Sequence, residues 1–260
     1  MGEQSSLVTR ARRKLGRAKR RAGNWLLAQR LKRWQAANQV STTRFQDRLQ
    51  RSASAAPADL LERLQADHAT YITTVSIKRQ AASWQFVALL ARLLSTGAFS
   101  SAVDFGSGFT SYTIRQWSQS AGVSLQTASV DDSPAWLDRT RAYLTQQGVP
   151  ADHLYVEPDF LATGSPQRPD LLVYDYSQFE HRTHFLPQIG RFLRPDSIIL
   201  FDDYQFRPDT AEYHRTLDYW CFEHSIKIVD LKSQTIDDYG RYAVLGYNAR
   251  SAFEALLQRL

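Results

Sequence analysis

The sequence predicts an α/β protein in which a mostly parallel sheet is covered by helices on both faces and is preceded by a helical extension. Two observations support this prediction. From about residue 100 onward, short apolar runs of strand character alternate with helical segments, a pattern typical of the βα units that build parallel sheets. The first 52 residues contain no proline, consist mostly of good helix formers and are strongly basic, which separates them from the rest.

Composition limits the protein to one α/β domain plus an extension. The chain has 260 residues, of which 43% are hydrophobic and 12% aromatic, enough to fill a core. Residues 1–52 hold fourteen Lys and Arg against two acids and so carry +12; because the whole chain carries +6, residues 53–260 carry −6. We therefore expect an anionic partner for the basic segment.

The single cysteine, Cys221, excludes a disulfide framework or a cysteine-based zinc site within one chain.

Residues 1–56 form the predicted basic helical extension, and residues 57–260 form the predicted main domain. Leu27, Leu31 and Trp34 recur at helical spacing among basic residues, which predicts one or two amphipathic helices. These helices could pack on the main domain or dock on a membrane surface or a partner protein, and nucleic acid is a weaker alternative. The chain shows no apolar run of membrane-spanning length and no secretory leader, so we expect a cytoplasmic protein, with a membrane-peripheral location as the alternative.

A linker and two helices are expected before the first strand. The small-residue stretch 51–58 is the linker candidate. Asp59 is placed to cap a short helix through Leu60, Leu61 and Leu64. Residues 80–95 predict a longer helix that covers the end of the sheet at which the glycine-rich turn lies.

The first strand, at 101–105, ends in this glycine-rich turn. Asp104 is followed by Gly106, Ser107, Gly108 and Thr110, and a helix is expected over residues 111–120. Glycines let the backbone turn sharply and approach a ligand closely. The first turn of the helix offers free N–H groups at the same place. The turn therefore predicts a ligand site, and the alternative is a plain strand–turn–helix corner without a ligand.

The second strand, at 125–131, ends in two acids. Asp131, 23 residues after Gly108, is the first candidate to hold a ribose diol, and Asp132 flanks it. A helix at 135–147 follows, with Pro134 near its first turn. A dinucleotide-binding turn would have a third glycine where this chain has Ser111, so a nicotinamide oxidoreductase is a weak alternative.

The turn D-x-G-x-G at Asp104–Gly108, with an acid pair after the next strand, resembles the class I S-adenosylmethionine-dependent methyltransferases. The resemblance implies a Rossmann-like, seven-stranded sheet with a final antiparallel hairpin. Strand-like runs lie at 101–105, 125–131, 153–157, 171–175, 197–201, 225–231 and 241–246.

The resemblance also implies the ligands of S-adenosylmethionine. The glycine turn and the acid pair would hold the methionine part and the ribose. Asp159 would accept a hydrogen bond from the adenine amino group, and Phe160 would pack on the adenine ring. A solvated turn is the alternative for these two residues. Asp175 would line the methionine pocket.

Three further acids follow the strands at 171–175 and 197–201. Asp175 ends the first of these strands, and Asp202 and Asp203 follow the second. If the strands are neighbours, three carboxylates converge and raise one another's pKa, a repulsion that a divalent cation relieves, Mg²⁺ by default.

An Asp after one strand and an Asp pair after the next resembles the metal-dependent O-methyltransferases. The macrocin and novobiocin-type sugar enzymes are closer in this respect than catechol O-methyltransferase. The resemblance implies that Asp175, Asp202 and Asp203 bind a metal that activates a substrate hydroxyl. Without a metal, Asp202 and Asp203 would cap the following helix or bind backbone N–H groups.

The general base is missing from the position at which these families have it, since Ser177 and Gln178 stand there. Glu180, His181 and His184 are the alternatives nearby. We expect a methyltransferase that acts on an oxygen of a small hydroxylated acceptor, such as a sugar, diol or phenol, with possible assistance by Mg²⁺.

Two other functions stay open at this point. One is a metal-free methyltransferase acting on RNA or on another nitrogen, carbon or oxygen nucleophile, with the basic arm as its anchor. The other is a catalytically silent scaffold that binds the cofactor. The edge hairpin and the helical arm leave room for a homodimer.

Overall fold

The computed structural model describes residues 2–51, 56–163, 168–205 and 208–260, and within its first helix it describes the side chains of residues 25–49. The strands are β1 (Ser101–Phe105), β2 (Gln126–Asp131), β3 (Leu154–Val156), β4 (Leu171–Tyr174), β5 (Ile198–Phe201), β6 (Lys227–Asp230) and β7 (Val244–Tyr247). The helices are α1 (Gly2–Arg51), α2 (Ala58–Thr74), α3 (Trp84–Ser95), α4 (Phe109–Ala121), α5 (Pro134–Gln146), α6 (Glu157–Thr163), α7 (Phe179–Ile189), α8 (Ala211–Glu223), α9 (Lys232–Thr235) and α10 (Arg250–Arg259).

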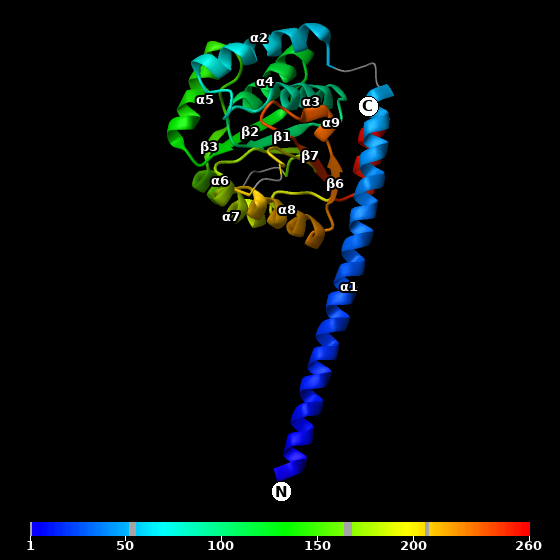
Figure 1. The fold of residues 1–260 in the computed structure, drawn as a ribbon. Helices are drawn as coiled ribbons and strands as arrows, with labels where there is room; N and C mark the ends of the chain where they lie inside the picture. Colours follow the sequence, from blue (N-terminus) through cyan, green and yellow to red (C-terminus); the bar gives the residue numbers. More distant parts are fainter. Residues whose placement is uncertain (1, 52–55, 164–167, 206–207) are drawn as a thin grey trace.

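The seven described strands form one sheet in the order β3-β2-β1-β4-β5-β7-β6 (Figure 1). Strands β1 to β5 run parallel to one another, whereas β7 runs antiparallel to both of its neighbours, β5 and β6. This confirms the predicted seven-stranded, mostly parallel sheet with an antiparallel pair at its C-terminal end. The reversed strand β7 lies inside the sheet, which makes β6 the edge strand.

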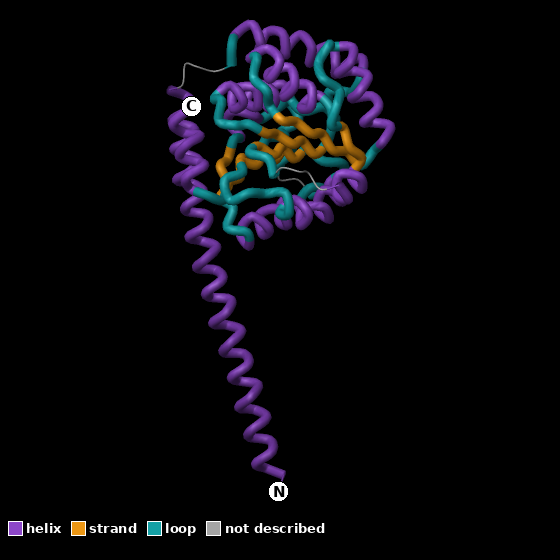
Figure 2. The backbone as a smooth tube through the Cα atoms, turned by 180° about the vertical axis from the view of Figure 1, so that it is seen from behind, coloured by secondary structure: helices purple, strands orange, loops and turns teal. Residues whose placement is uncertain are grey.

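Helices cover both faces of the sheet, as predicted for βα units (Figure 2). Alternate residues of each strand supply two separate cores: on β1, Ala102 belongs to one and Val103 to the other. The first core packs under α2, α3, α4, α5 and α10. The second core packs under α6, α7 and α8, and it includes Cys221, which is a fully buried thiol.

Helix α1 is one continuous helix whose C-terminal half lies along the edge strand β6, while its N-terminal half extends far beyond the domain (Figures 1 and 2). Polar side chains spaced four residues apart bind the edge backbone. Trp34 Nε1 donates to the carbonyl of Ile226 at 2.8 Å, and Asn38 Oδ1 accepts from the N–H of Ile228 at 3.1 Å. An exposed strand edge is a pairing hazard, and covering it with a helix removes that hazard.

The next turns of α1 continue this arrangement. Thr42 Oγ1 accepts from the N–H of Asp230 at 2.9 Å, and Gln46 Nε2 donates to the carbonyl of the same residue at 3.3 Å. The side chains of Phe45 and Leu49 belong to the core of the domain. The second half of the basic extension is therefore part of the domain's packing.

The first turns of α5 and α2 test two predictions that were made from local sequence. Pro134 lies in the first turn of α5, as the sequence predicts. Ser133, which precedes it, caps the helix by accepting from the N–H of Trp136. The expected cap at Asp59 is wrong: Pro57 precedes α2, and Asp59 lies in its first turn without a capping hydrogen bond. No described helix is long and apolar enough to cross a membrane.

Candidate active site

The turn between β1 and α4 brings the ends of β1 and β4 into backbone contact. Gly106 has φ +95°, and a Cβ at this position would lie 1.8 Å from the carbonyl oxygen of Asp175. Gly108 has φ +155°, and a Cβ there would lie 3.1 Å from Tyr71 Oη. The first glycine is therefore required by a contact within the protein, and the second lets Tyr71 of α2 approach the turn closely.

Asp104 lies beneath the turn and is 1% exposed. It accepts from Ser111 Oγ at 2.5 Å and from Thr110 Oγ1 at 3.3 Å on α4, and from Ser129 Oγ at 2.6 Å on β2. Burial raises the pKa of this carboxyl above its usual range, opposed by the nearby Arg115. The oxygens of Asp104 are thus bound by the protein itself, and the residue fixes the shape of the turn.

Asp131 closes the same turn from the end of β2. One of its oxygens accepts from Ser107 N at 2.8 Å and from Ser107 Oγ at 3.0 Å, and the other accepts from Ser133 N at 3.0 Å. A carboxylate has about four acceptor positions, so one remains for a ligand. Burial raises the pKa of Asp131 to about 6. Its neighbour Asp132 is exposed and accepts from Ser177 Oγ at 2.6 Å.

These groups fit a nucleoside-type cofactor. The first N–H groups of α4 have no partner within the helix and point to the turn. Tyr71 is 1% exposed, and its hydroxyl has no hydrogen-bond partner among the described residues. A buried hydroxyl without a partner calls for a polar group at that position. Tyr71 comes from α2, whereas the sequence predicted that the helix at 80–95 would cover this end of the sheet.

The residues after β3 lie differently from their prediction. Phe160 is 2% exposed and packs against Phe105 and Phe192 in the core under α6. Asp159 is exposed on α6. The acid directly at the end of β3 is Glu157, which accepts hydrogen bonds from the hydroxyl of Tyr176 and from His181 Nε2.

The three predicted metal ligands do follow neighbouring strands, but a buried arginine holds them. Arg182, on α7, has a 4% exposed side chain; its guanidinium lies 3.2 Å from Asp175 and 3.4 Å from Asp203. It also donates to the carbonyls of Tyr176, Ser177 and Asp202 in the two loops. Ser177 and Asp203, one in each loop, have φ +50° and +56°, so non-glycine residues there adopt a left-handed conformation.

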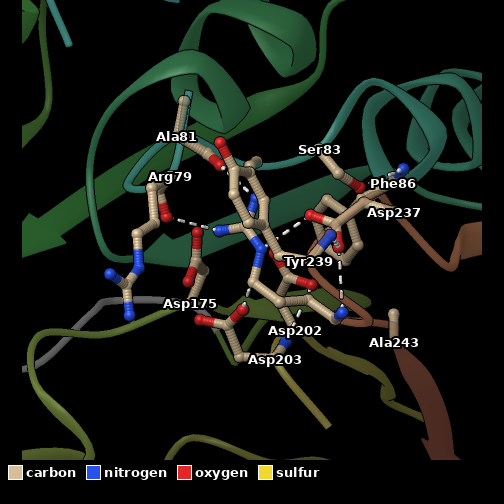
Figure 3. Close-up of polar contacts among 12 residues, drawn as sticks. Arg79, Ala81, Ser83, Phe86, Asp175, Asp202, Asp203, Asp237, Tyr239 and Ala243 are labelled. Atoms are coloured by element: carbon tan, nitrogen blue, oxygen red, sulfur yellow. Dashed lines mark hydrogen bonds and ion pairs between the residues drawn. The ribbon is translucent and has the colours of Figure 1, made fainter. Parts of the chain in front are cut away.

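A second arginine, Arg241, approaches the same acids from the loop before β7. Its Nε lies 3.7 Å from Asp203 Oδ1 and 2.7 Å from Asp237 Oδ2. Figure 3 shows these two acids together with Asp175 and Asp202. The other nitrogens of Arg241 donate to the carbonyls of Arg79 and Ala81 in the α2–α3 loop. Burial raises the pKa of Asp175 to about 7 and that of Asp202 well above its usual range.

The predicted Mg²⁺ site is not supported. Asp175 and Asp203 are neutralised by Arg182, and Asp203 also by Arg241, so the cations that buried carboxylates require come from the chain itself. In the described parts of the chain, no three His, Cys, Asp or Glu side chains are arranged to hold a metal ion. The residues therefore do not fit the metal that the acid pattern suggested.

The three candidate bases are all on α7 and differ in their surroundings. Glu180 and His184 are exposed. His181 Nε2 lies 2.8 Å from Glu157, and its side chain is 42% exposed. His181 and Arg182 are adjacent in the sequence but contact different strand ends. His181 contacts the residue that follows β3, whereas Arg182 contacts the residues that follow β4 and β5.

Sequence reasoning missed four residues of this region: Tyr71, Glu157, Arg182 and Arg241. For the arginines a signal existed, because three acids at buried strand ends require compensating positive charge. Nothing in the sequence near residues 182 and 241 distinguishes these arginines from the many exposed ones. Glu157 could have been found as the acid closest to the end of the third strand.

No family model matches the chain, and no curated protein matches it in sequence. Solved structures do match. Cofactor-bound Rv0187 from MTB has a TM-score of 0.56 over 72% of this chain and 89% of its own, at 20% identity. An O-methyltransferase from Bacillus cereus in complex with SAH has a TM-score of 0.52 over 83% and 98%, at 13% identity. TomG, an O-methyltransferase of tomaymycin synthesis from Streptomyces achromogenes in complex with SAM, scores 0.51 over 76% and 92%, at 13% identity.

These likenesses concern the fold. The strand order, the reversed strand β7 and the glycine turn after β1 are those of the class I methyltransferases. The chain therefore has the class I methyltransferase fold, with an N-terminal helix that covers the edge of the sheet.

Proposed function

We propose that this protein is an S-adenosylmethionine-dependent methyltransferase that acts on an oxygen of a small hydroxylated acceptor. The observation that carries the proposal is the β1–α4 turn. There Gly108, the remaining acceptor position of Asp131 and the hydroxyl of Tyr71, which no described residue hydrogen-bonds, come together. The O-methyltransferases among the similar structures support the choice of oxygen.

Within this proposal, Asp131 binds a ribose hydroxyl, and the N-terminus of α4 and the Tyr71 hydroxyl contact polar groups of the cofactor. When bound, S-adenosylmethionine supplies the activated methyl group. The chain contributes mainly alignment of the two reactants. The acceptor region we assign lies beside the ends of β3 and β4, where His181 and the hydroxyl of Tyr176 both contact Glu157. Arg182 orders the neighbouring loops after β4 and β5.

The proposed reaction does not use a metal ion. Arg182 and Arg241 supply the positive charge beside Asp175 and Asp203. Among the three predicted bases, His181 is the one we assign to accept the hydroxyl proton, because Glu157 orients its ring. A histidine held by a carboxylate is suited to general-base catalysis near neutral pH.

A methyl-transfer assay tests this proposal. Full-length protein is given S-adenosylmethionine with a labelled methyl group and a panel of phenols, diols and sugars, with EDTA or with Mg²⁺. We expect label in at least one acceptor, at equal rates in both conditions. His181→Gln should lower kcat by about 100-fold or more, whereas the exposed control His184→Gln should match the wild type.

The outcomes separate the parts of the proposal. Activity that requires Mg²⁺ would contradict the role given to the two arginines. If the labelled methyl group is found in RNA and in no compound of the panel, RNA replaces the small hydroxylated compounds as the acceptor. Cofactor binding without any transfer would favour the silent scaffold.

A further inference from the structure

The N-terminal half of α1 is a surface that the proposed activity does not explain. From Trp34 onward the helix is fixed to the domain, and Trp34 is the first buried residue among its described side chains. The helix continues without interruption in the other direction and leaves the domain behind (Figure 1). At a rise of about 1.5 Å per residue, the 30 or so residues before Trp34 span roughly 45 Å.

The described side chains just before Trp34 expose large apolar groups. Trp25 is 62% exposed, Leu26 56%, Leu27 44% and Leu31 39%. These four residues lie within two turns of helix, and they include the Leu27 and Leu31 that the sequence pattern grouped with Trp34. Apolar side chains that are exposed together on a soluble surface mark an interaction site.

The same segment is strongly and uniformly basic. Between Glu3 and Asp47 the sequence has twelve Lys and Arg and no acid. Lys32 and Arg33 are exposed next to the apolar group. Tryptophan is enriched at membrane interfaces, and each basic residue near the surface is attracted to anionic lipids, so this combination of residues suits a membrane surface.

We propose that the part of α1 before Trp34 binds the surface of an anionic membrane and holds the catalytic domain there. A lipid surface satisfies both features, because its headgroups meet the basic residues and its acyl chains bury Trp25 and Leu26, which at about 100° per residue lie outside the helix face through which Trp34 contacts the domain. The rest of the chain carries −6 and is repelled by the same surface, so the helix is the contact.

Two other binding partners for this part of α1 account for fewer of its features. A second copy of the helix would bring two segments of +12 together without acids to pair them. A nucleic acid would use the charge, but its phosphate backbone would leave the leucines exposed. We therefore assign the lipid surface as the occupant.

Vesicle co-sedimentation of the full-length protein tests the inference. The probes are vesicles of phosphatidylcholine alone and of a three-to-one mixture with phosphatidylglycerol. We expect binding to the mixed vesicles only, weakened by salt. The double variant Lys32→Glu/Arg33→Glu should lower the partition coefficient by roughly 25-fold or more. Trp25→Ser/Leu26→Ser should lower it by at least about tenfold.

Matched controls use exposed residues elsewhere. Arg92→Glu/Arg141→Glu removes the same charge and Val123→Ser removes an exposed apolar side chain, and both should bind like the wild type. If the control variants lose as much vesicle binding as the two test variants, the inference is overturned. Preference for an RNA oligonucleotide over the mixed vesicles, or a stable dimer that Trp25→Ser/Leu26→Ser dissociates, would also overturn it.

Discussion

Asp131 combines a structural role with the binding role that we propose for it. Its carboxylate holds the turn through Ser107 and Ser133, and one acceptor position remains. Asp132, next to it in the sequence, is exposed and bound to Ser177. The sequence could rank the two acids only by their position at the strand end. The structure distinguishes them by burial and by hydrogen-bond partners.

This difference predicts the pH dependence of cofactor binding. The pKa of Asp131 is raised to about 6, so its carboxylate is ionised at pH 7 and becomes protonated below pH 6. Affinity for S-adenosylmethionine should therefore be constant just above pH 7 and fall by up to about tenfold per pH unit below 6. Asp131→Asn should bind about 10- to 100-fold more weakly at pH 7 and lose the pH dependence. Calorimetric titration at several pH values measures this.

Asp132→Asn is the control, and it should behave like the wild type at each pH. If Asp132→Asn weakens binding as much as Asp131→Asn does, the ribose contact has been given to the wrong acid. Thermal melts of both variants show whether the turn itself has been lost.

Helix α1 shows how an element can be predicted while its main structural role is missed. Its helical character and charge follow directly from composition. Its role as the cover of an edge strand depends on Asn38, Thr42 and Gln46, polar residues that would otherwise suggest an exposed face. That role depends on which strand becomes the edge, and this is a property of the complete sheet.

The edge contact makes a specific prediction for stability. Thr42 is 7% exposed and its hydroxyl accepts from the N–H of Asp230. Thr42→Val keeps the volume but leaves that N–H without a partner, which should lower the free energy of unfolding by about 1–3 kcal/mol. Thr43→Val, one residue away on the exposed side, should change it by less than about 0.5 kcal/mol. Urea unfolding compares the two, and similar losses would contradict the edge-covering role.

Among the other elements, the buried strands were the most predictable, because each is a short continuous apolar run. The helix α10 was not predicted, and α8 was anticipated only as a helix that follows Asp202 and Asp203, although both helices supply core residues such as Leu217 and Phe253. The segment after β3 was predicted to bind adenine, with a solvated turn as the alternative, and it begins α6 in the structure. That difference accounts for Phe160, since a residue in the first turns of a helix that packs on the sheet faces the core.

For the molecule as a whole, the fold could be predicted from the sequence and the electrostatics of the site could not. The alternation of strands and helices and the glycine turn were sufficient for the sheet. The three acids were placed correctly at neighbouring strand ends, but their partners Arg182 and Arg241 come from a helix and a loop that lie 59 residues apart in sequence. Positive charge was needed there, and the sequence does not show whether a metal or an arginine supplies it.

The central claim is that the end of β1 and β2 binds S-adenosylmethionine. Calorimetric titration of S-adenosylmethionine into the full-length protein, followed by S-adenosylhomocysteine and NADH in separate experiments, tests it most directly. We predict a saturable one-to-one heat for S-adenosylmethionine, competition by S-adenosylhomocysteine, no heat for NADH and no effect of EDTA. Absence of heat for S-adenosylmethionine, or binding of NADH in its place, would contradict the assignment of the site.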